Sequence, residues 1–266
     1  FAGSYDLHLY DANGCFESYT ITVGEPSIAL SIDSVVVSNT IDCFGGTDGG
    51  AQTYVSGGMP NYYFMWDNGE LNSNAVNLTS GYHVLTLTDD WGCVVKDSVY
   101  VNENTLIETT ISVDNEVSCY GLSDGSVSAT SVGGSPNYTY FWSNLSTSNT
   151  GNSSTNSGLI YGSYYLTTQD IYGCEVFDTV LVLQPDPLDV ESDEIDSISC
   201  YGYDDGLAYA YAWGGTSPYT FYWDSLSGFV GDTNGMLTPG VHTVFVVDDR
   251  GCISSDTVLI HEPPLF

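Results

Sequence analysis

Apolar and polar residues alternate along much of the chain, in short stretches. The clearest examples are residues 82–88 and 241–247, where every second position is apolar or the run is nearly continuous in β-branched residues. Turn-forming clusters of the types Gly-Gly-x-Pro, Asn-Gly and Asp-x-x-Gly separate these stretches. No segment keeps the 3.6-residue period of a helix. The pattern therefore predicts an all-β protein of short antiparallel strands.

One set of motifs occurs three times in the same order. Each full copy contains Cys-x-Gly-x-x-Asp-Gly, a Gly-Gly turn with proline, an aromatic stretch that ends in Trp, Leu-x-x-Gly, and Asp-x-x-Gly-Cys. The copies run from Cys43 to Cys93, from Cys119 to Cys174 and from Cys200 to Cys252, and a partial copy ends at Cys15. The first cysteines lie 76 and 81 residues apart. This period is too long for a solenoid repeat and fits a small autonomous sandwich.

We therefore expect tandem immunoglobulin-like antiparallel β-sandwich repeats of about 80 residues. Short linkers, most of them proline-containing, place the domains at 1–26 (the C-terminal part of a truncated repeat), 27–104, 105–187 and 188–266. The Leu-x-x-Gly-x-Tyr segment resembles the corner at which immunoglobulin-like chains cross between sheets. Trp66, Trp142 and Trp223 recur at one position and are expected in the cores rather than on a sugar-binding surface.

These spaced motifs together resemble the SprB-type repeat. That family occurs in very large surface adhesins of gliding and related Bacteroidota, which the type IX secretion system exports. The resemblance covers the whole chain, and it implies an adhesive or fibre-forming role at the outer surface of a Gram-negative bacterium. It also implies that the chain is a segment of a longer polypeptide.

The charge of the chain narrows its possible partners. Only Lys96 and Arg250 are basic, against 34 acidic residues, and the net charge is −32. Nucleic acids and anionic membranes would repel such a chain. The 42% hydrophobic and 14% aromatic content nevertheless indicates packed cores rather than disorder. No stretch reaches the roughly 20 apolar residues of a membrane span.

The seven cysteines indicate disulfides in an oxidising exterior. Two pairings are considered. Pairing within copies would join Cys43 to Cys93, Cys119 to Cys174 and Cys200 to Cys252, whereas pairing across linkers would give 15–43, 93–119 and 174–200. We favour the first, because successive domains that run end to end would hold the cysteines of the second scheme tens of ångströms apart.

No cofactor is expected, with calcium as the one candidate. A chain with so many carboxylates lowers its self-repulsion by binding divalent ions or by screening. Asp48, Asp124 and Asp205 are the expected oxygen donors, together with the Asp-x-x-Gly-Cys turns. The adjacent acidic pairs, such as Asp248-Asp249, fit turn chemistry better than acid–base catalysis.

Asp-Ser/Thr followed by an aliphatic residue is the general O-glycosylation acceptor in Bacteroidota, the source that the resemblance implies. This tripeptide occurs six times, with the hydroxyl residues Ser34, Ser98, Thr179, Ser197, Ser225 and Thr257. Ser98, Thr179 and Thr257 occupy equivalent positions of the last strand. Regular glycans there would shield a stalk from proteolysis and from lateral pairing of its sheet edges.

No catalytic constellation is found, and we predict that the protein is not an enzyme. The expected function is a structural or adhesive stalk or filament segment of a large secreted adhesin, involved in attachment and gliding motility. The alternative is a carbohydrate-binding module array of a secreted hydrolase. The polar loop 144–156, which lacks aromatic residues, favours the stalk. Expected partners are surface glycans, other cell-surface proteins or copies of the chain itself in a fibre.

Overall fold

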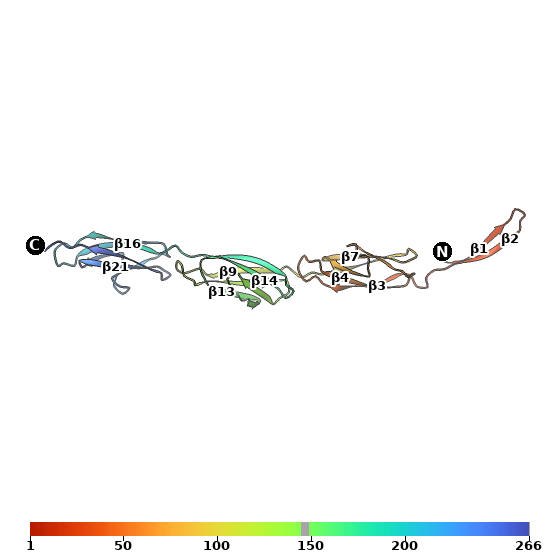
Figure 1. The fold of residues 1–266 in the computed structure, drawn as a ribbon, viewed down its shortest axis with the longest axis horizontal. Coiled ribbons are helices and arrows are strands. Elements are labelled where there is room, and N and C mark those ends of the chain that lie inside the picture. The colour runs from red at the N-terminus through yellow and green to blue at the C-terminus, as the bar shows by residue number, and fades with distance from the viewer. Residues whose placement is uncertain (145–148, 266) are drawn as a thin grey trace. The chain divides into compact units, whose positions relative to one another are not determined.

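A computed structural model describes residues 1–144 and 149–265, and every regular element in these ranges is a β-strand (Figure 1). The predicted all-β fold class is confirmed. Residues 145–148 of the polar loop lie outside the described residues. The strands are β1 (Gly3–Tyr10), β2 (Phe16–Val23), β3 (Ser31–Asn39), β4 (Gly49–Ser56), β5 (Tyr63–Trp66), β6 (Asn74–Leu78), β7 (Gly81–Thr88), β8 (Val94–Val101), β9 (Glu108–Asn115), β10 (Gly125–Val132), β11 (Tyr138–Trp142), β12 (Asn149–Gly151), β13 (Ser153–Leu159), β14 (Gly162–Gln169), β15 (Glu175–Val182), β16 (Asp189–Asp196), β17 (Gly206–Trp213), β18 (Thr220–Trp223), β19 (Phe229–Val230), β20 (Thr233–Leu237), β21 (Gly240–Val247) and β22 (Ile253–Ile260).

The chain forms two compact units, Phe1–Leu106 and Ile107–Phe266. The first unit contains the antiparallel hairpin β1–β2, whose residues are all exposed, and one sandwich. The sheets of that sandwich have the strand orders β3-β4-β6 and β5-β7-β8. The turn of this hairpin has the same contact as the turn between β7 and β8, since Cys15 N donates to Asp11 Oδ1 as Cys93 N does to Asp89 Oδ1.

The second unit contains two further sandwiches with the same plan. The sheets of the second sandwich are ordered β13-β10-β9 and β12-β11-β14-β15, and those of the third β16-β17-β20 and β19-β18-β21-β22. Every strand pair in these sheets is antiparallel. The short strand β12 extends one sheet of the second sandwich at its edge, beside β11, and β19 does the same beside β18 in the third.

Each sandwich has its own hydrophobic core, which is made by the inward-facing residues that alternate along the strands of both sheets. The repeated tryptophans lie in these cores, with Trp66 and Trp142 2% exposed and Trp223 1% exposed. Each indole N–H donates within its own sandwich, to Asn72 O (3.1 Å), Ser154 Oγ (3.1 Å) and Gly231 O (3.0 Å) respectively. The expectation that these rings are core residues is confirmed.

The glycine of the Asp-Gly motif starts the second strand of each sandwich, where the two sheets approach closely. A Cβ atom at Gly49 would lie 2.8 Å from a methyl group of Val101 in the facing sheet, and one at Gly206 would lie 2.5 Å from a methyl group of Ile260. A side chain at this position would push the sheets apart. The recurring glycine is therefore a packing requirement.

The corner between sheets has the expected geometry in the second sandwich, where Tyr164 Oη donates to Ile160 O at 2.9 Å. In the first sandwich the corner residue is not Tyr82, which is 72% exposed, but His83. His83 Nε2 lies 2.9 Å from Thr79 O, and His242 of the third sandwich lies 2.8 Å from Thr238 O. All three corners thus bond a ring to the carbonyl four residues upstream.

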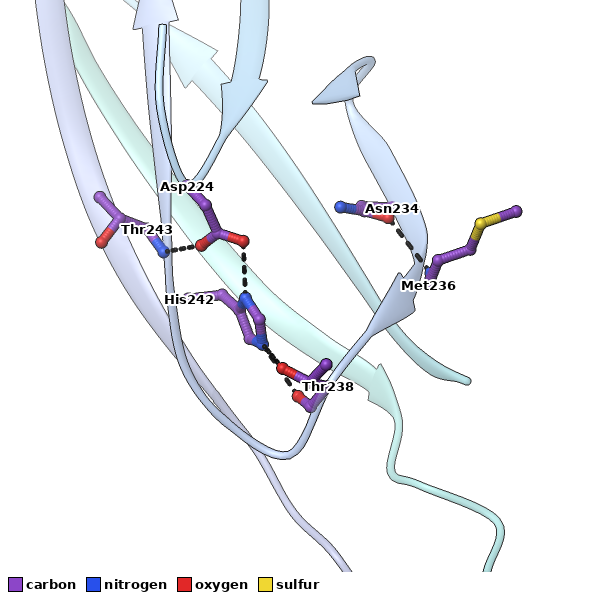
Figure 2. Close-up of polar contacts among 6 residues, drawn as sticks. All are labelled: Asp224, Asn234, Met236, Thr238, His242 and Thr243. Atoms are coloured by element: carbon purple, nitrogen blue, oxygen red, sulfur yellow. Dashed lines mark hydrogen bonds and ion pairs between the residues drawn. The ribbon is translucent and has the colours of Figure 1, made fainter. Parts of the chain in front are cut away.

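The histidine corners have a second contact, which the tyrosine corner lacks. His242 Nδ1 lies 2.9 Å from Asp224 Oδ2, while Asp224 Oδ1 accepts from Thr243 N at 3.2 Å (Figure 2). Carbonyl and carboxylate oxygens only accept, so the ring donates to both neighbours only in its protonated form. The histidine therefore ties the start of β21 to the end of β18.

Replacing His242 by tyrosine should preserve the bond to Thr238 O, whereas phenylalanine should lose both polar contacts. A buried partner left unsatisfied costs about 1–3 kcal/mol. Amide hydrogen exchange of β21, which reports the third sandwich alone, should rank the free energy of opening as wild type, then His242→Tyr, then His242→Phe. Tyr164→Phe is the matched control in the second sandwich. Equal exchange in the Tyr and Phe variants would contradict this role of the corner.

Candidate functional site at the ends of the sandwiches

The two cysteines of one copy lie at opposite ends of their sandwich. In the second sandwich β10 leaves the loop of Cys119 and reaches Gly133, whose neighbour Gly134 faces the hairpin that carries Cys174. The strand is 8 residues long, and at about 3.3 Å per residue it separates the ends by about 25 Å. We call these ends the first-cysteine loop and the second-cysteine hairpin. The first and third sandwiches have the same arrangement.

A buried aspartate organises each second-cysteine hairpin. Asp89 Oδ1 accepts from the backbone N–H groups of Trp91 (3.0 Å) and Cys93 (2.8 Å), and Asp89 Oδ2 accepts from Met59 N in the Gly-Gly loop (2.9 Å). Asp170 and Asp248 make the same three contacts in their own sandwiches. The three residues are only 2–5% exposed. One carboxylate thus joins two loops, and we call this arrangement the aspartate clamp.

The three N–H groups stabilise the charged form of the clamp. The Met59 N–H, followed by those of Cys93 and Trp91, holds the pKa of Asp89 below 3.8 despite the opposing effect of burial. Desolvation by nearby protein atoms, followed by the negative charge of the Asp89 carboxylate, raises the pKa of the neighbouring Cys93 thiol above 9.0. In the first sandwich the Asp-x-x-Gly-Cys motif is therefore a structural unit with an ionised carboxylate at its centre.

The aspartates predicted to bind calcium close the first-cysteine loops. Asp124 accepts from Ser118 N (3.0 Å) and Ser118 Oγ (2.5 Å), and Asp205 accepts from Ser199 in the same way (3.0 and 2.5 Å). The serine hydroxyls are the main cause of the lowered pKa of both carboxyls. Asp48 accepts from Asp42 N at 3.3 Å.

A second acceptor holds each first-cysteine loop from the linker side. Gly45 N donates to Glu103 Oε2 (2.6 Å), Gly121 N to Gln184 Oε1 (3.0 Å) and Gly202 N to Glu262 Oε1 (2.6 Å). Within 1–144 and 149–265, no three histidine, cysteine or acidic side chains converge as a metal site. Calcium binding by Asp48, Asp124 and Asp205 stays a prediction.

The disulfide pairing predicted within copies is wrong. Cys119 of the second sandwich is bonded to Cys252 of the third, 133 residues away in sequence. This bond excludes the pairs 119–174 and 200–252. Cys93 is a free, exposed thiol, which excludes 43–93, while Cys43 and Cys174 are both disulfide-bonded. The physical reason is the separation of about 25 Å between the two cysteines of a copy, because a disulfide needs Cα atoms within about 7 Å.

Pairing across linkers is wrong as well, since Cys15 and Cys200 are free and Cys119 is not bonded to Cys93. The observed bond follows a third register, which joins the first-cysteine loop of one sandwich to the second-cysteine hairpin of the following one. Its Cα atoms are 5.7 Å apart. The fixed distance of four residues from clamp aspartate to cysteine, present in all four copies, was the sequence signal for a rigid hairpin end.

The junction around Cys119 and Cys252 is a packed contact between two loops. Tyr120 and Leu122 of the second sandwich and Pro187, Leu188 and Ile253 of the third line one pocket together with both cysteines. Arg250 lines a second pocket with Val117 and Pro185, and its charge contributes to the lowered pKa of Asp124. One of the two basic residues of the chain thus lies at this junction.

The predicted glycosylation residues lie mainly on accessible surface. Ser98, Thr179 and Thr257 are exposed on the edge strands β8, β15 and β22. Ser197 and Ser225 are exposed outside strands, whereas Ser34 is half-buried in β3. Their modification stays a prediction.

A protein-family model matches part of the second sandwich. Residues 111–147 match the SprB repeat. The matched stretch of this SprB repeat includes the first-cysteine loop, the Gly-Gly turn and the tryptophan strand. The resemblance seen in the motifs is confirmed there.

No curated protein matches the chain. Among solved structures, the tetra-tandem repeat in the extending region of a large adhesion protein is 14% identical, with a TM-score of 0.36, and the match covers 95% of this chain and 79% of that one. Sidekick-1 immunoglobulin domains 1–5 are 12% identical (TM-score 0.35; 97% and 66% covered). The eight N-terminal immunoglobulin domains of Down Syndrome Cell Adhesion Molecule are also 12% identical (TM-score 0.39; 98% and 43% covered). This chain therefore spans 43–66% of the length of the last two.

The SprB repeat and the disulfide together indicate an adhesin-like extracellular repeat segment. The matched family and the similar structures are repeat and adhesion domains. None of the described residues belongs to a helix long and apolar enough to cross a membrane.

The clamp should make the first sandwich sensitive to acid. Because the pKa of Asp89 is below 3.8 in the folded state, its stabilising effect is complete above the unfolded pKa and is lost as the pH falls through the folded one. Hydrogen exchange of β7 should therefore accelerate below about pH 4 in the wild type. Asp89→Asn should exchange faster than wild type already at pH 7 and respond less to acid. The control is Asp90→Asn, whose carboxylate is exposed; equal acid responses of the Asp89 variant and wild type would refute this role.

Proposed function

We propose that the chain is a load-bearing stalk segment of a secreted adhesin on the surface of a Gram-negative bacterium, acting in attachment and gliding. The observation that carries this proposal is the disulfide between Cys119 and Cys252. A bond between consecutive sandwiches contributes nothing to the closure of either one, but it bears tension between them. The recurrence of the same two loops in every copy supports a joint designed for repetition.

The bond would change the path of force through the second unit. Tension that enters before β9 reaches Cys119, crosses to Cys252 and leaves through β22. The chain between these cysteines, whose sequence separation is 133, lies in a closed loop that cannot be drawn out, although fully extended it would span about 480 Å at roughly 3.6 Å per residue. A stalk built in this way limits its own extension when domains open under load.

Single-molecule pulling tests this path. Handles attached by enzymatic ligation at residues 105 and 264 of the full chain avoid its free thiols. The wild type should extend only through the residues outside the disulfide loop, whereas the double variant Cys119→Ser, Cys252→Ser should release about 480 Å more contour length. Cys15→Ser, which leaves the disulfide in place, is the control. Equal contour lengths of wild type and double variant would refute the load-bearing role.

O-glycosylation is a second part of the proposal, based on the SprB resemblance and on the exposed edge positions of Ser98, Thr179 and Thr257. Intact-mass spectrometry of protein from the native host should show a mass above that of the bare polypeptide. The triple variant Ser98→Ala, Thr179→Ala, Thr257→Ala should lose most of the excess, and alanine at half-buried Ser34 should not. A native mass equal to that of the bare polypeptide would contradict O-glycosylation.

A further inference from the structure

The outer face of the third sandwich has a row of aromatic side chains. Tyr209, Tyr211 and Trp213 occupy alternate positions of β17 and are 38%, 40% and 45% exposed, while Ala208 and Ala210 on the opposite face of the strand are buried. Neighbouring ring centroids lie 6.4 Å and 5.6 Å apart. The three rings therefore form a continuous aromatic strip on the solvent side of the sheet.

A row of carboxylates runs beside the strip on β16. The antiparallel register places Asp189 opposite Trp213, Glu191 opposite Tyr211 and Asp193 opposite Tyr209. All three acidic residues are exposed. The Tyr211 hydroxyl donates to Glu191 Oε2, and this bond is the main cause that raises the pKa of Tyr211 to about 12. Each ring thus has a negative group on the adjacent strand.

The fold does not require this face. The equivalent residues of β10 in the second sandwich are Ser128, Thr130 and Val132, and those of β4 in the first are Gln52, Tyr54 and Ser56. Both of these sandwiches have the same strand plan and closed cores. Side chains that the architecture needs recur in every copy, as the core tryptophans do. The aromatic and acidic rows occur together only in the third copy.

We propose that this face binds guanidinium and ammonium groups of a basic protein segment. Aromatic faces attract cations through their quadrupole, and guanidinium groups also stack on aromatic rings. The carboxylates of β16 add charge-assisted hydrogen bonds to the same groups. The rest of the chain offers few competing cations, because its only basic residues are Lys96 on β8 of the first sandwich and Arg250 at the disulfide junction.

The sign of the surface charge favours this ligand over a glycan. Acidic sugars would be repelled by the carboxylate row and by the net charge of −32. Neutral sugars would gain from the rings but nothing from the net charge. A basic segment uses both rows. This proposal goes beyond the stalk role, and neither depends on the other.

A blocked tri-arginine peptide is the probe, added to the full-length protein and followed through the β16 and β17 amide signals in NMR. The triple variant Tyr209→Ser, Tyr211→Thr, Trp213→Val installs the residues of the second sandwich and keeps the net charge. Its affinity for the probe should fall at least 10-fold, since all three ring faces that attract the cations are removed. Glu191→Gln with Asp193→Asn should lower the affinity as well, and tri-lysine should bind more weakly than tri-arginine.

The exposed pair Tyr82 and Tyr100, whose ring centroids are 4.9 Å apart in the first sandwich, supplies the control. Replacing both by serine should leave tri-arginine binding unchanged. Equal affinity of the aromatic triple variant and wild type would show general charge attraction and overturn the proposal. Binding of neutral cellohexaose at these amides, without binding of tri-arginine, would overturn it in favour of a glycan site. Unchanged hydrogen exchange of β21 for the third-sandwich variants, and of β4 for the variant at Tyr82 and Tyr100, shows that the variants fold.

Discussion

The repeated architecture depends on one interaction, a buried carboxylate that accepts three backbone hydrogen bonds. Burying a carboxyl group without partners would be unfavourable, so Asp89, Asp170 and Asp248 are tolerated only because two loops direct N–H groups at each of them. The dependence also runs the other way, because the carboxylate is the acceptor that these N–H groups share. The carboxylate thereby fixes the hairpin on which the second cysteine is carried. The cysteine is then presented at the end of a sandwich with little conformational entropy left to lose on forming a disulfide.

The sequence alone was sufficient for the fold class, the copies and the core tryptophans, because these rest on local periodicity and on exact recurrence. It was not sufficient for the disulfides. The pairing within copies assumed that the cysteines of a copy approach each other, whereas the strands between Cys119 and Cys174 carry them to opposite ends. That information is topological and appears only when strand order is known. The corner residue of the first copy is a further case, since Tyr82 and His83 are adjacent and point to opposite faces of β7, so that the aromatic type alone does not identify the inward ring.

The candidate site residues also divide into those whose role the sequence indicated and those whose role depends on the strand arrangement. Asp48, Asp124 and Asp205 were expected as ligand oxygens because acidic loop residues near glycine suit calcium, but in the structure serine or backbone donors of their own loops engage them. The clamp aspartates were expected as turn residues and as further calcium ligands, and their contact with the distant Gly-Gly loop has no local signature. The aromatic strip of Tyr209, Tyr211 and Trp213 was not predicted, since alternation on a strand is uninformative until the carboxylates of β16 are known to lie beside it.

The disulfide also bears on how such a segment withstands cleavage. Residues 119–252 form a covalent ring, so a protease that cuts one peptide bond anywhere within it opens the ring without separating the two sides. The exposed turn at 225–227 is an accessible place for such a cut. A surface protein nicked there would keep its distal part attached through the bond between Cys119 and Cys252. Reduction of this bond, or a cut outside residues 119–252, would release it. Resistance to shedding is thus a property of how the copies are connected and needs no exceptional stability of any single sandwich.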